Sequence, residues 1–127
     1  MGIQSIDHFE LVVKDVARTL EFYKGLGFQV GEAGQGRRRS IIKIGETQQI
    51  NIVSPEDVQA LGRTASPGGS HVCMVWKGTV EEVVEHLAKC GVTPRRGPVQ
   101  ASGSRGLGTS VYFYDPDDNS MEIMVYP

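Results

Sequence analysis

Cysteine, net charge and long apolar runs are all scarce in this chain of 127 residues. Two cysteines, Cys73 and Cys90, are too few for a disulfide scaffold and are typical of a reduced, cytoplasmic protein. A net charge of −2 does not supply the basic surface that nucleic-acid binding needs. No apolar run approaches the ~20 residues of a membrane helix, and the first residues lack a signal-peptide pattern. We therefore expect a cytoplasmic protein with no nucleic-acid or membrane partner.

The sequence that is present repeats itself. Asp-His-Phe-Glu-Leu-Val-Val-Lys-Asp at 7–15 matches Ser-His-Val-Cys-Met-Val-Trp-Lys-Gly at 70–78, so that His8 falls on His71. Further matches follow in the same order: 40–42 with 110–112, and 49–53 with 120–124. Matches of several segments in one order indicate a duplicated module rather than chance.

Each copy has the pattern of one strand, one helix and three strands. The predicted strands of the first copy are 6–13, 28–32, 38–44 and 49–54, around a helix over 16–25. Those of the second copy are 71–77, 93–96, 109–114 and 120–126, around a helix over 80–90. The glycine-rich stretch 97–108 is predicted to be a hairpin loop, equally well a mobile lid or an ordinary surface loop. The expected fold is α+β: two βαβββ modules that form a curved, half-barrel mixed sheet around a metal cavity.

The domain organisation follows from the repeat. We expect a single domain over 1–127, with module one at about 1–54, a linker at 55–69 and module two at about 70–127. Proline and glycine concentrate in the linker segment, which favours an irregular connection.

Three side chains from three strands are predicted to converge in the cavity. Strand alternation turns His8, His71 and Glu122 away from the helices. A lone histidine on a strand is more often structural than a metal ligand. Here, however, both histidines occupy the same position of the repeat, and a buried carboxylate is costly without a partner. Two imidazoles and one carboxylate form a facial triad that binds a divalent metal and leaves coordination positions open.

These residues resemble the vicinal oxygen chelate superfamily, which includes glyoxalase I, extradiol dioxygenases, fosfomycin-resistance transferases and bleomycin-resistance proteins. The stretches that carry the resemblance are 6–15, 22–28, 69–72 and 111–123. Together they span essentially the whole chain. The similarity is greatest to small proteins of the glyoxalase-domain-containing protein 5 type. Because this fold hosts several chemistries, the resemblance implies the fold more specifically than the reaction.

The resemblance implies metal ligation by His8, His71 and Glu122. At the fourth ligand position, where glyoxalase I has a glutamate that also serves as a base, this chain has Asn51, with Gln49 on the same face. An amide oxygen can ligate a metal, but it cannot accept a proton at neutral pH. This departure argues against standard glyoxalase I chemistry, and whether Asn51 or Gln49 ligates the metal stays open.

Other candidate residues surround this set. Ser110 and Tyr112 match positions that contact substrate in the fosfomycin branch, although simple sheet packing explains them equally well. Glu10 shares the face of His8 and is expected to be either a neighbouring carboxylate or a base. Glu122, Glu10 and Tyr112 are thus the predicted catalytic residues, and Ser110, Tyr112 and Asn51 the predicted substrate-binding residues. The arginine run 37–39 is expected to be a solvated charged surface.

The expected function is that of a divalent-metal-dependent enzyme acting on a small oxygen-chelating substrate. A lyase or isomerase, a ring-cleaving dioxygenase and a transferase all remain open, with Fe, Mn, Ni or Zn as the metal. The alternative is a metal-free protein that sequesters a ligand in the manner of bleomycin-resistance proteins. The resemblance also implies a homodimer, with the cavity either within one chain or shared between two.

Overall fold

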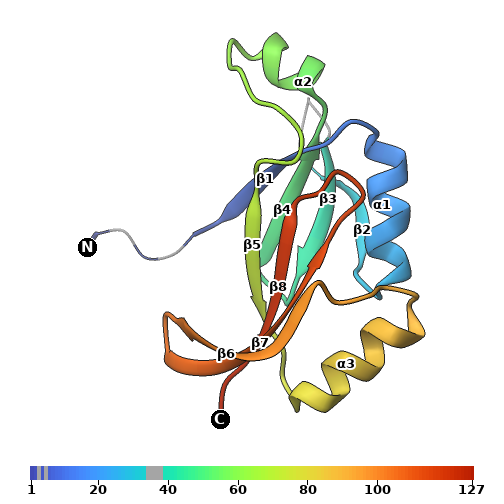
Figure 1. Ribbon diagram of the computed structural model, residues 1–127. Helices are drawn as coiled ribbons and strands as arrows, with labels where there is room; N and C mark the ends of the chain where they lie inside the picture. Colours follow the sequence, from blue (N-terminus) through green and yellow to red (C-terminus); the bar gives the residue numbers. More distant parts are fainter. Residues whose placement is uncertain (3, 5, 34–38) are drawn as a thin grey trace. The chain divides into compact units, whose positions relative to one another are not determined.

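The computed structural model describes residues 1–2, 4, 6–33 and 39–127. The chain forms two compact units, unit one from Met1 to Gly68 and unit two from Gly69 to Pro127. Each unit contains one four-stranded mixed sheet with a helix against it (Figure 1). The α+β class and the two βαβββ modules predicted from the repeat are therefore confirmed.

Unit one is built on the strand order β1-β4-β3-β2. Its elements are β1 (His8–Val12), α1 (Val16–Gly25), β2 (Val30–Ala33), β3 (Arg39–Ile44), β4 (Gln48–Val53) and α2 (Pro55–Ala60). Strand β1 runs parallel to β4, and the other pairs are antiparallel. The Asp15 side chain caps α1 by accepting a hydrogen bond from the Arg18 N–H at 3.0 Å. Helix α1 buries Tyr23 against the sheet, whose core includes Leu11 and Ile42.

Helix α2 lies in the segment 55–69 that was expected to be a linker. Ser54 and Asp57 form a capping box, and Pro55 occupies the first helical turn, where proline is favoured. The helix packs Val58 onto Val12 and Val53. Val12, which shares the strand face of His8 and Glu10, is consequently buried beneath α2.

Unit two repeats the arrangement with the order β5-β8-β7-β6. Its elements are β5 (His71–Val75), α3 (Val80–Lys89), β6 (Arg96–Gly103), β7 (Gly106–Tyr114) and β8 (Ser120–Val125). Strand β5 runs parallel to β8, and β8-β7-β6 are antiparallel. Thr79 and Glu82 form the capping box of α3, and the helix buries Val83 and Leu87 completely.

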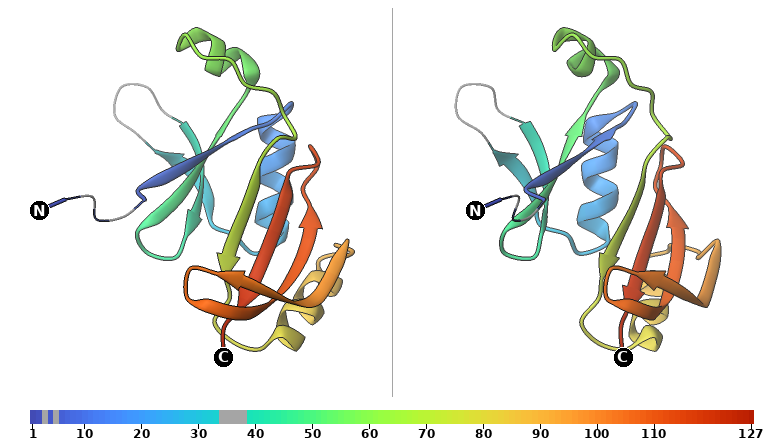
Figure 2. Two further views of the ribbon diagram at one scale, coloured as in Figure 1. Left: turned by 60° about the vertical axis from the view of Figure 1, so that its left-hand side comes forward. Right: turned by 90° about the vertical axis from the view of Figure 1, so that its left-hand side faces the viewer.

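The stretch 97–108 is not the loop that its glycines predicted. It forms most of a hairpin of β6 and β7, whose strands pair up to Gly103 and Gly106 (Figure 2). Two glycines serve close packing here rather than a turn. A Cβ on Gly108 would lie 2.7 Å from the backbone oxygen of Val125, and one on Gly103 would collide with the Tyr126 hydroxyl. In these strands glycine allows close contact with a neighbouring strand, although the same residue is also typical of loops.

Part of the arginine run 37–39 lies outside the described residues. This part is Arg37 and Arg38, and Arg38 is also the first residue of the predicted strand 38–44. Among the residues that are described, no helix is both long enough and apolar enough to cross a membrane.

Candidate functional site

The register of β5 against β8 is fixed by the turn that precedes β8. Asp115 Oδ1 accepts hydrogen bonds from the backbone N–H groups of Asp117 and Asn119, both at 2.9 Å. The buried Asn119 amide donates to Asp115 Oδ2 at 2.9 Å, and its Oδ1 accepts from the Ser70 N–H at 3.1 Å. The Ser120 N–H donates to the Ser70 carbonyl at 2.9 Å. Since the start of β5 is thereby tied to the start of β8, the first residue of β5 is held opposite Ser120.

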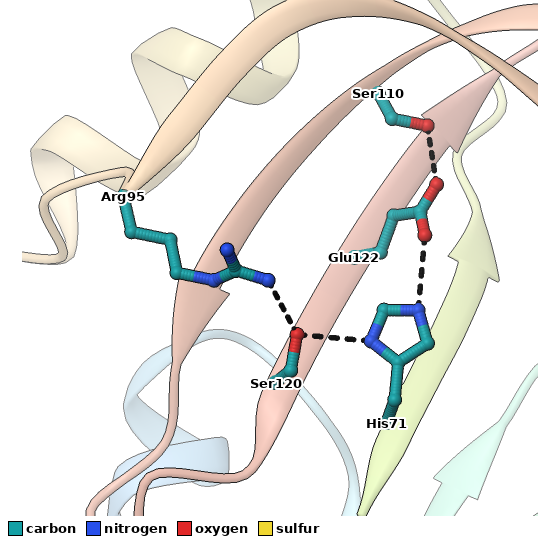
Figure 3. Close-up of polar contacts among 5 residues, drawn as sticks. All are labelled: His71, Arg95, Ser110, Ser120 and Glu122. Atoms are coloured by element: carbon teal, nitrogen blue, oxygen red, sulfur yellow. Dashed lines mark hydrogen bonds and ion pairs between the residues drawn. The ribbon is translucent and has the colours of Figure 1, made fainter.

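That first residue is His71, and it meets Glu122 on the sheet face away from α3. His71 Nε2 lies 3.1 Å from Glu122 Oε1. The second carboxylate oxygen, Oε2, accepts a hydrogen bond of 2.6 Å from the fully buried Ser110 hydroxyl (Figure 3). Both oxygens of the carboxylate are therefore held by side chains from neighbouring strands, which fixes its orientation.

Glu122 stays ionised although it is only 6% exposed. Burial opposes the charge, but hydrogen bonds to the carboxylate outweigh that effect and hold its pKa below the ordinary value of 4.5. These bonds come from four side chains: Ser110, His71, Cys73 and Tyr112. The site thus presents a preorganised negative charge at neutral pH.

Two of these donors hold their own protons tightly. Burial, followed by the charge of Glu122 and a hydrogen bond to it, raises the pKa of the Cys73 thiol to about 12. Burial and then the charge of Glu122 likewise raise the pKa of Tyr112 above 10.0. At neutral pH both groups are protonated donors, so neither is a thiolate or phenolate nucleophile.

The other nitrogen of His71 joins a second polar chain. Its Nδ1 lies 2.9 Å from Ser120 Oγ, which also accepts a hydrogen bond of 2.7 Å from Arg95 Nη2 (Figure 3). The imidazole ring stacks on Tyr112, with 6.3 Å between ring centroids. The sequence did not predict that Ser120 and Arg95 belong to the site, nor that Cys73 donates a hydrogen bond to Glu122. Ser120 had a signal in the sequence, because it precedes Glu122 by two residues and therefore shares its strand face.

Unit one places its polar residues in the same register. His8 and Glu10 of β1 pair with Gln49 and Asn51 of β4, as His71 and Cys73 of β5 pair with Ser120 and Glu122 of β8. Asn51 is therefore the counterpart of Glu122 in the first module. The Gln49 side-chain amide donates to Asn51 Oδ1 at 2.8 Å, and Asn51 is only 2% exposed.

His8 and Glu10 each have a charged neighbour in unit one. His8 Nδ1 lies 2.8 Å from the Asp7 carboxylate, and both side chains are exposed. The two oxygens of Glu10 accept hydrogen bonds of 2.9 and 3.2 Å from the guanidinium of Arg63, which follows α2. The hydrogen bond and charge of Glu10 raise the pKa of Arg63. A bidentate pair of this kind neutralises the Glu10 carboxylate.

The donors of unit two fit part of a divalent metal site. Two ligand atoms bound at right angles with bonds of about 2.1 Å are about 3 Å apart, and His71 Nε2 and Glu122 Oε1 are separated by 3.1 Å. His8, the third expected ligand, belongs to unit one. Within the described residues, no group of three or more His, Cys, Asp and Glu side chains is arranged to hold a metal. Two of the three predicted ligands are thus together.

Comparison with known proteins agrees with this fold. A family profile described as the Glyoxalase/Bleomycin resistance protein/Dioxygenase superfamily matches residues 5–123. Virulence protein STM3117 of Salmonella typhimurium is 32% identical over 128 residues, covering 99% of this chain and 87% of that protein. The glyoxalase domain-containing protein RDO1 of Mycosarcoma maydis is 30% identical over 127 residues, covering 99% of this chain and 70% of that protein. The chain belongs to the glyoxalase/bleomycin resistance protein/dioxygenase superfamily.

Solved structures repeat the arrangement over the full chain. An integron cassette protein from the mobile metagenome of V. cholerae matches with a TM-score of 0.84 and 30% identity, covering 100% of this chain and 98% of that one. Two more distant structures share the fold alone. A lactoylglutathione lyase from Agrobacterium tumefaciens has a TM-score of 0.75 at 19% identity, covering 98% and 96% of the two chains. TnmS3, an antibiotic-binding protein from Streptomyces sp. CB03234, has a TM-score of 0.75 at 20% identity, covering 100% and 99%.

Proposed function

We propose that this protein is a divalent-metal-dependent enzyme that acts on a small oxygen-chelating substrate. The observation that carries the proposal is the pairing of His71 Nε2 with Glu122 Oε1 at 3.1 Å, with the carboxylate ionised and both residues oriented by neighbouring hydroxyls. His71 and Glu122 would hold the metal together with His8. Two imidazoles and one carboxylate suit Fe, Mn, Ni or Zn.

When bound, the metal would act as a Lewis acid that stabilises negative charge developing on the substrate oxygens. The residues of the chain prepare this site in distinct ways. Ser110 holds Glu122 Oε2 at 2.6 Å, so that Oε1 stays beside His71. A ligating imidazole needs its lone pair on Nε2, and Ser120 Oγ at 2.9 Å can accept a hydrogen bond from the Nδ1–H of His71.

Tyr112 and Glu10 receive different roles. Because its pKa is raised, the Tyr112 hydroxyl keeps its proton and would donate a hydrogen bond to a substrate oxygen as negative charge develops there. Both oxygens of Glu10 are occupied by Arg63. Of the two roles expected for Glu10, we therefore favour that of a neighbouring carboxylate over that of a base.

Asn51 bears on the reaction class. It occupies the register position in module one that Glu122 occupies in module two. Since an amide cannot take a proton at neutral pH, no base is supplied at this position, although Asn51 or Ser110 could still bind substrate. A lyase or isomerase would need another base, whereas a ring-cleaving dioxygenase would not rely on this one.

The test is metal uptake by the whole protein after removal of metal with a chelator. Titration with Mn²⁺, followed by elemental analysis, is expected to give one ion per chain. His71→Ala, Glu122→Gln and His8→Ala are each expected to weaken binding at least tenfold. His86→Ala is the matched control. It also removes an imidazole, but His86 lies on α3, with its ring against that of Trp76. Normal folding without stoichiometric uptake, or equal losses in all four variants, would refute the proposal.

Reaction class is then decided by substrate. Oxygen uptake with a catechol and dependence on Fe would identify a dioxygenase. Turnover of a hemithioacetal without oxygen, supported by Ni or Zn, would identify a lyase or isomerase.

The second candidate is a metal-free protein that sequesters a ligand. Two observations favour it: an amide stands at the module-one counterpart of Glu122, and the fold is shared with the antibiotic-binding TnmS3. Bleomycin binding that is unchanged in a His8→Ala/His71→Ala double variant would support this candidate. Binding that is lost with the histidines would favour the metal site.

We also propose a homodimer. His8 and His71 lie in different units, so a metal site needs the two units to meet, either within one chain or across two chains. Sedimentation equilibrium with and without Mn²⁺ distinguishes these arrangements, because only a site shared across chains makes dimerisation metal-dependent.

A further inference from the structure

Two exposed arginines gather beside His71 on the face of unit two. The Arg95 guanidinium lies over the rings of Tyr112 and Tyr114, with 5.1 and 4.8 Å to their centroids. Its backbone N–H donates to the Tyr112 carbonyl at 2.8 Å, so the residue is anchored at both ends. Arg96 Cζ also lies over Tyr112, at 5.9 Å from the ring centroid. We call these four residues the arginine–tyrosine cluster.

The Arg95 guanidinium has more hydrogen-bond donors than its side-chain bond to Ser120 uses. A guanidinium has five N–H donors, and Arg95 directs one side-chain bond, of 2.7 Å, to Ser120 Oγ. Among the residues that the structure describes, no carboxylate forms an ion pair with Arg95 or Arg96. Two positive charges that share one ring repel each other, and an anion between them would relieve that repulsion.

The cluster is connected directly to the candidate metal ligands. Ser120 Oγ accepts from Arg95 at 2.7 Å and lies 2.9 Å from His71 Nδ1. Two hydrogen bonds and the width of one imidazole ring separate Arg95 from His71 Nε2, a span of at most about 8 Å. A small substrate could therefore contact Arg95 while its oxygens lie beside His71 and Glu122.

We infer that the arginine–tyrosine cluster is a binding subsite for an oxyanion of the substrate, a phosphoryl, phosphonate or carboxylate group, with Arg95 as its principal ligand. This inference deepens the proposed function and rests on it for the neighbouring chemistry. The planar guanidinium offers paired donors that match an oxyanion, and the two rings and Ser120 fix it before binding. Because Arg95 is already ordered, binding loses little side-chain entropy. The substrate class is thus an anionic one whose charged group is a few ångströms from its chelating oxygens.

A purely structural role is the competing explanation, and the chain offers a matched control for it. Arg105 lies over the Tyr126 ring at 5.6 Å in the same unit. It forms the same kind of cation–π contact but belongs to the β6–β7 turn, and among the described residues no hydrogen bond or ion pair joins it to His71. Replacing Arg105 by glutamine changes the net charge as replacing Arg95 does, without touching the cluster.

The test is titration of the metal-free protein with inorganic phosphate, and separately with acetate, at constant ionic strength. Nε–H signals of the arginines are followed by NMR. We expect saturable binding with a dissociation constant on the order of 1 mM for the better probe. Arg95→Gln should weaken it at least tenfold and Arg95→Lys by less, because lysine keeps the charge but loses the fork. Arg105→Gln should leave it unchanged.

The results separate this inference from the metal proposal. Absence of saturable binding, or equal weakening by Arg95→Gln and Arg105→Gln, would overturn the subsite even if Mn²⁺ binds normally. Binding of either probe that depends on Arg95 supports the subsite even if no metal binds, and the tighter probe identifies the oxyanion.

Discussion

Replacing Ser110 by alanine isolates the hydrogen bond that orients Glu122. The Ser110 hydroxyl is fully buried and donates to Glu122 Oε2 at 2.6 Å. A hydrogen bond to a charged group contributes about 1.5–3 kcal/mol, and removing one oxygen leaves little cavity. We therefore expect Ser110→Ala to lower the free energy of unfolding of the metal-free protein by about 2 kcal/mol at pH 7.

The same substitution has a defined pH dependence. The pKa of Glu122 in the folded protein lies below its ordinary value of 4.5, so the hydrogen bonds stabilise the ionised form. Their contribution is fully present above pH 4.5 and is lost as the pH falls through the folded-state pKa. The difference in stability between the unmodified protein and Ser110→Ala should accordingly shrink below pH 4.5.

Urea unfolding followed by circular dichroism, at pH 7 and in acid with a chelator present, measures this difference. Ser102→Ala, at an exposed position of β6, is the control and should change stability by less than about 0.5 kcal/mol. A loss in Ser110→Ala of the same size at both pH values would refute the assignment, as would a loss at pH 7 no larger than that of the control.

Three other substitutions or modifications have defined outcomes. Because the pKa of Cys73 is raised to about 12, iodoacetamide should label this thiol at pH 8 roughly a thousandfold more slowly than an ordinary thiol. Glu122→Gln should make the labelling faster, and mass spectrometry of the metal-free protein measures both rates. Gly108→Ala should cost about 1–3 kcal/mol by thermal unfolding, since its Cβ would meet backbone at 2.7 Å, whereas Gly31→Ala, with open space around it, should be nearly neutral. Asn119→Ala should cost about 2–4 kcal/mol, because it removes the hydrogen bonds that join the buried Asn119 side chain to Asp115 and to the Ser70 N–H. It should also weaken Mn²⁺ uptake by displacing β5. Full stability in the last variant would contradict the role given to the turn.

Much of the fold was predictable because local signals agreed with the tertiary structure. The helix over 16–25 was expected with the bounds it has, since Asp15 caps it and glycine ends it. The loop prediction for 97–108 was wrong because a glycine at a turn and a glycine under a packed side chain look alike in sequence. The two cases differ only in their neighbours, and Gly103 and Gly108 both lie against Met124 and Tyr126.

The candidate site was predictable to the extent that strand alternation determines it. Period-two alternation put His71 and Glu122 on one face, and the parallel pairing of β5 with β8 brings them together. Arg95 was missed because the sequence predicted a strand over 93–96, whereas β6 begins only at Arg96. Its position also depends on the rings of β7. The joint placement of His8 with His71 and Glu122 stays a prediction, because His8 belongs to unit one and the other two residues belong to unit two.

Anomalous scattering from crystals of the protein grown with Mn²⁺ is the most direct test of the metal site. We expect one strong anomalous peak per chain, at bonding distance from His71 Nε2, Glu122 Oε1 and the imidazole of a His8. A peak bound elsewhere, or crystals in which these three side chains surround no metal at saturating Mn²⁺, would contradict it.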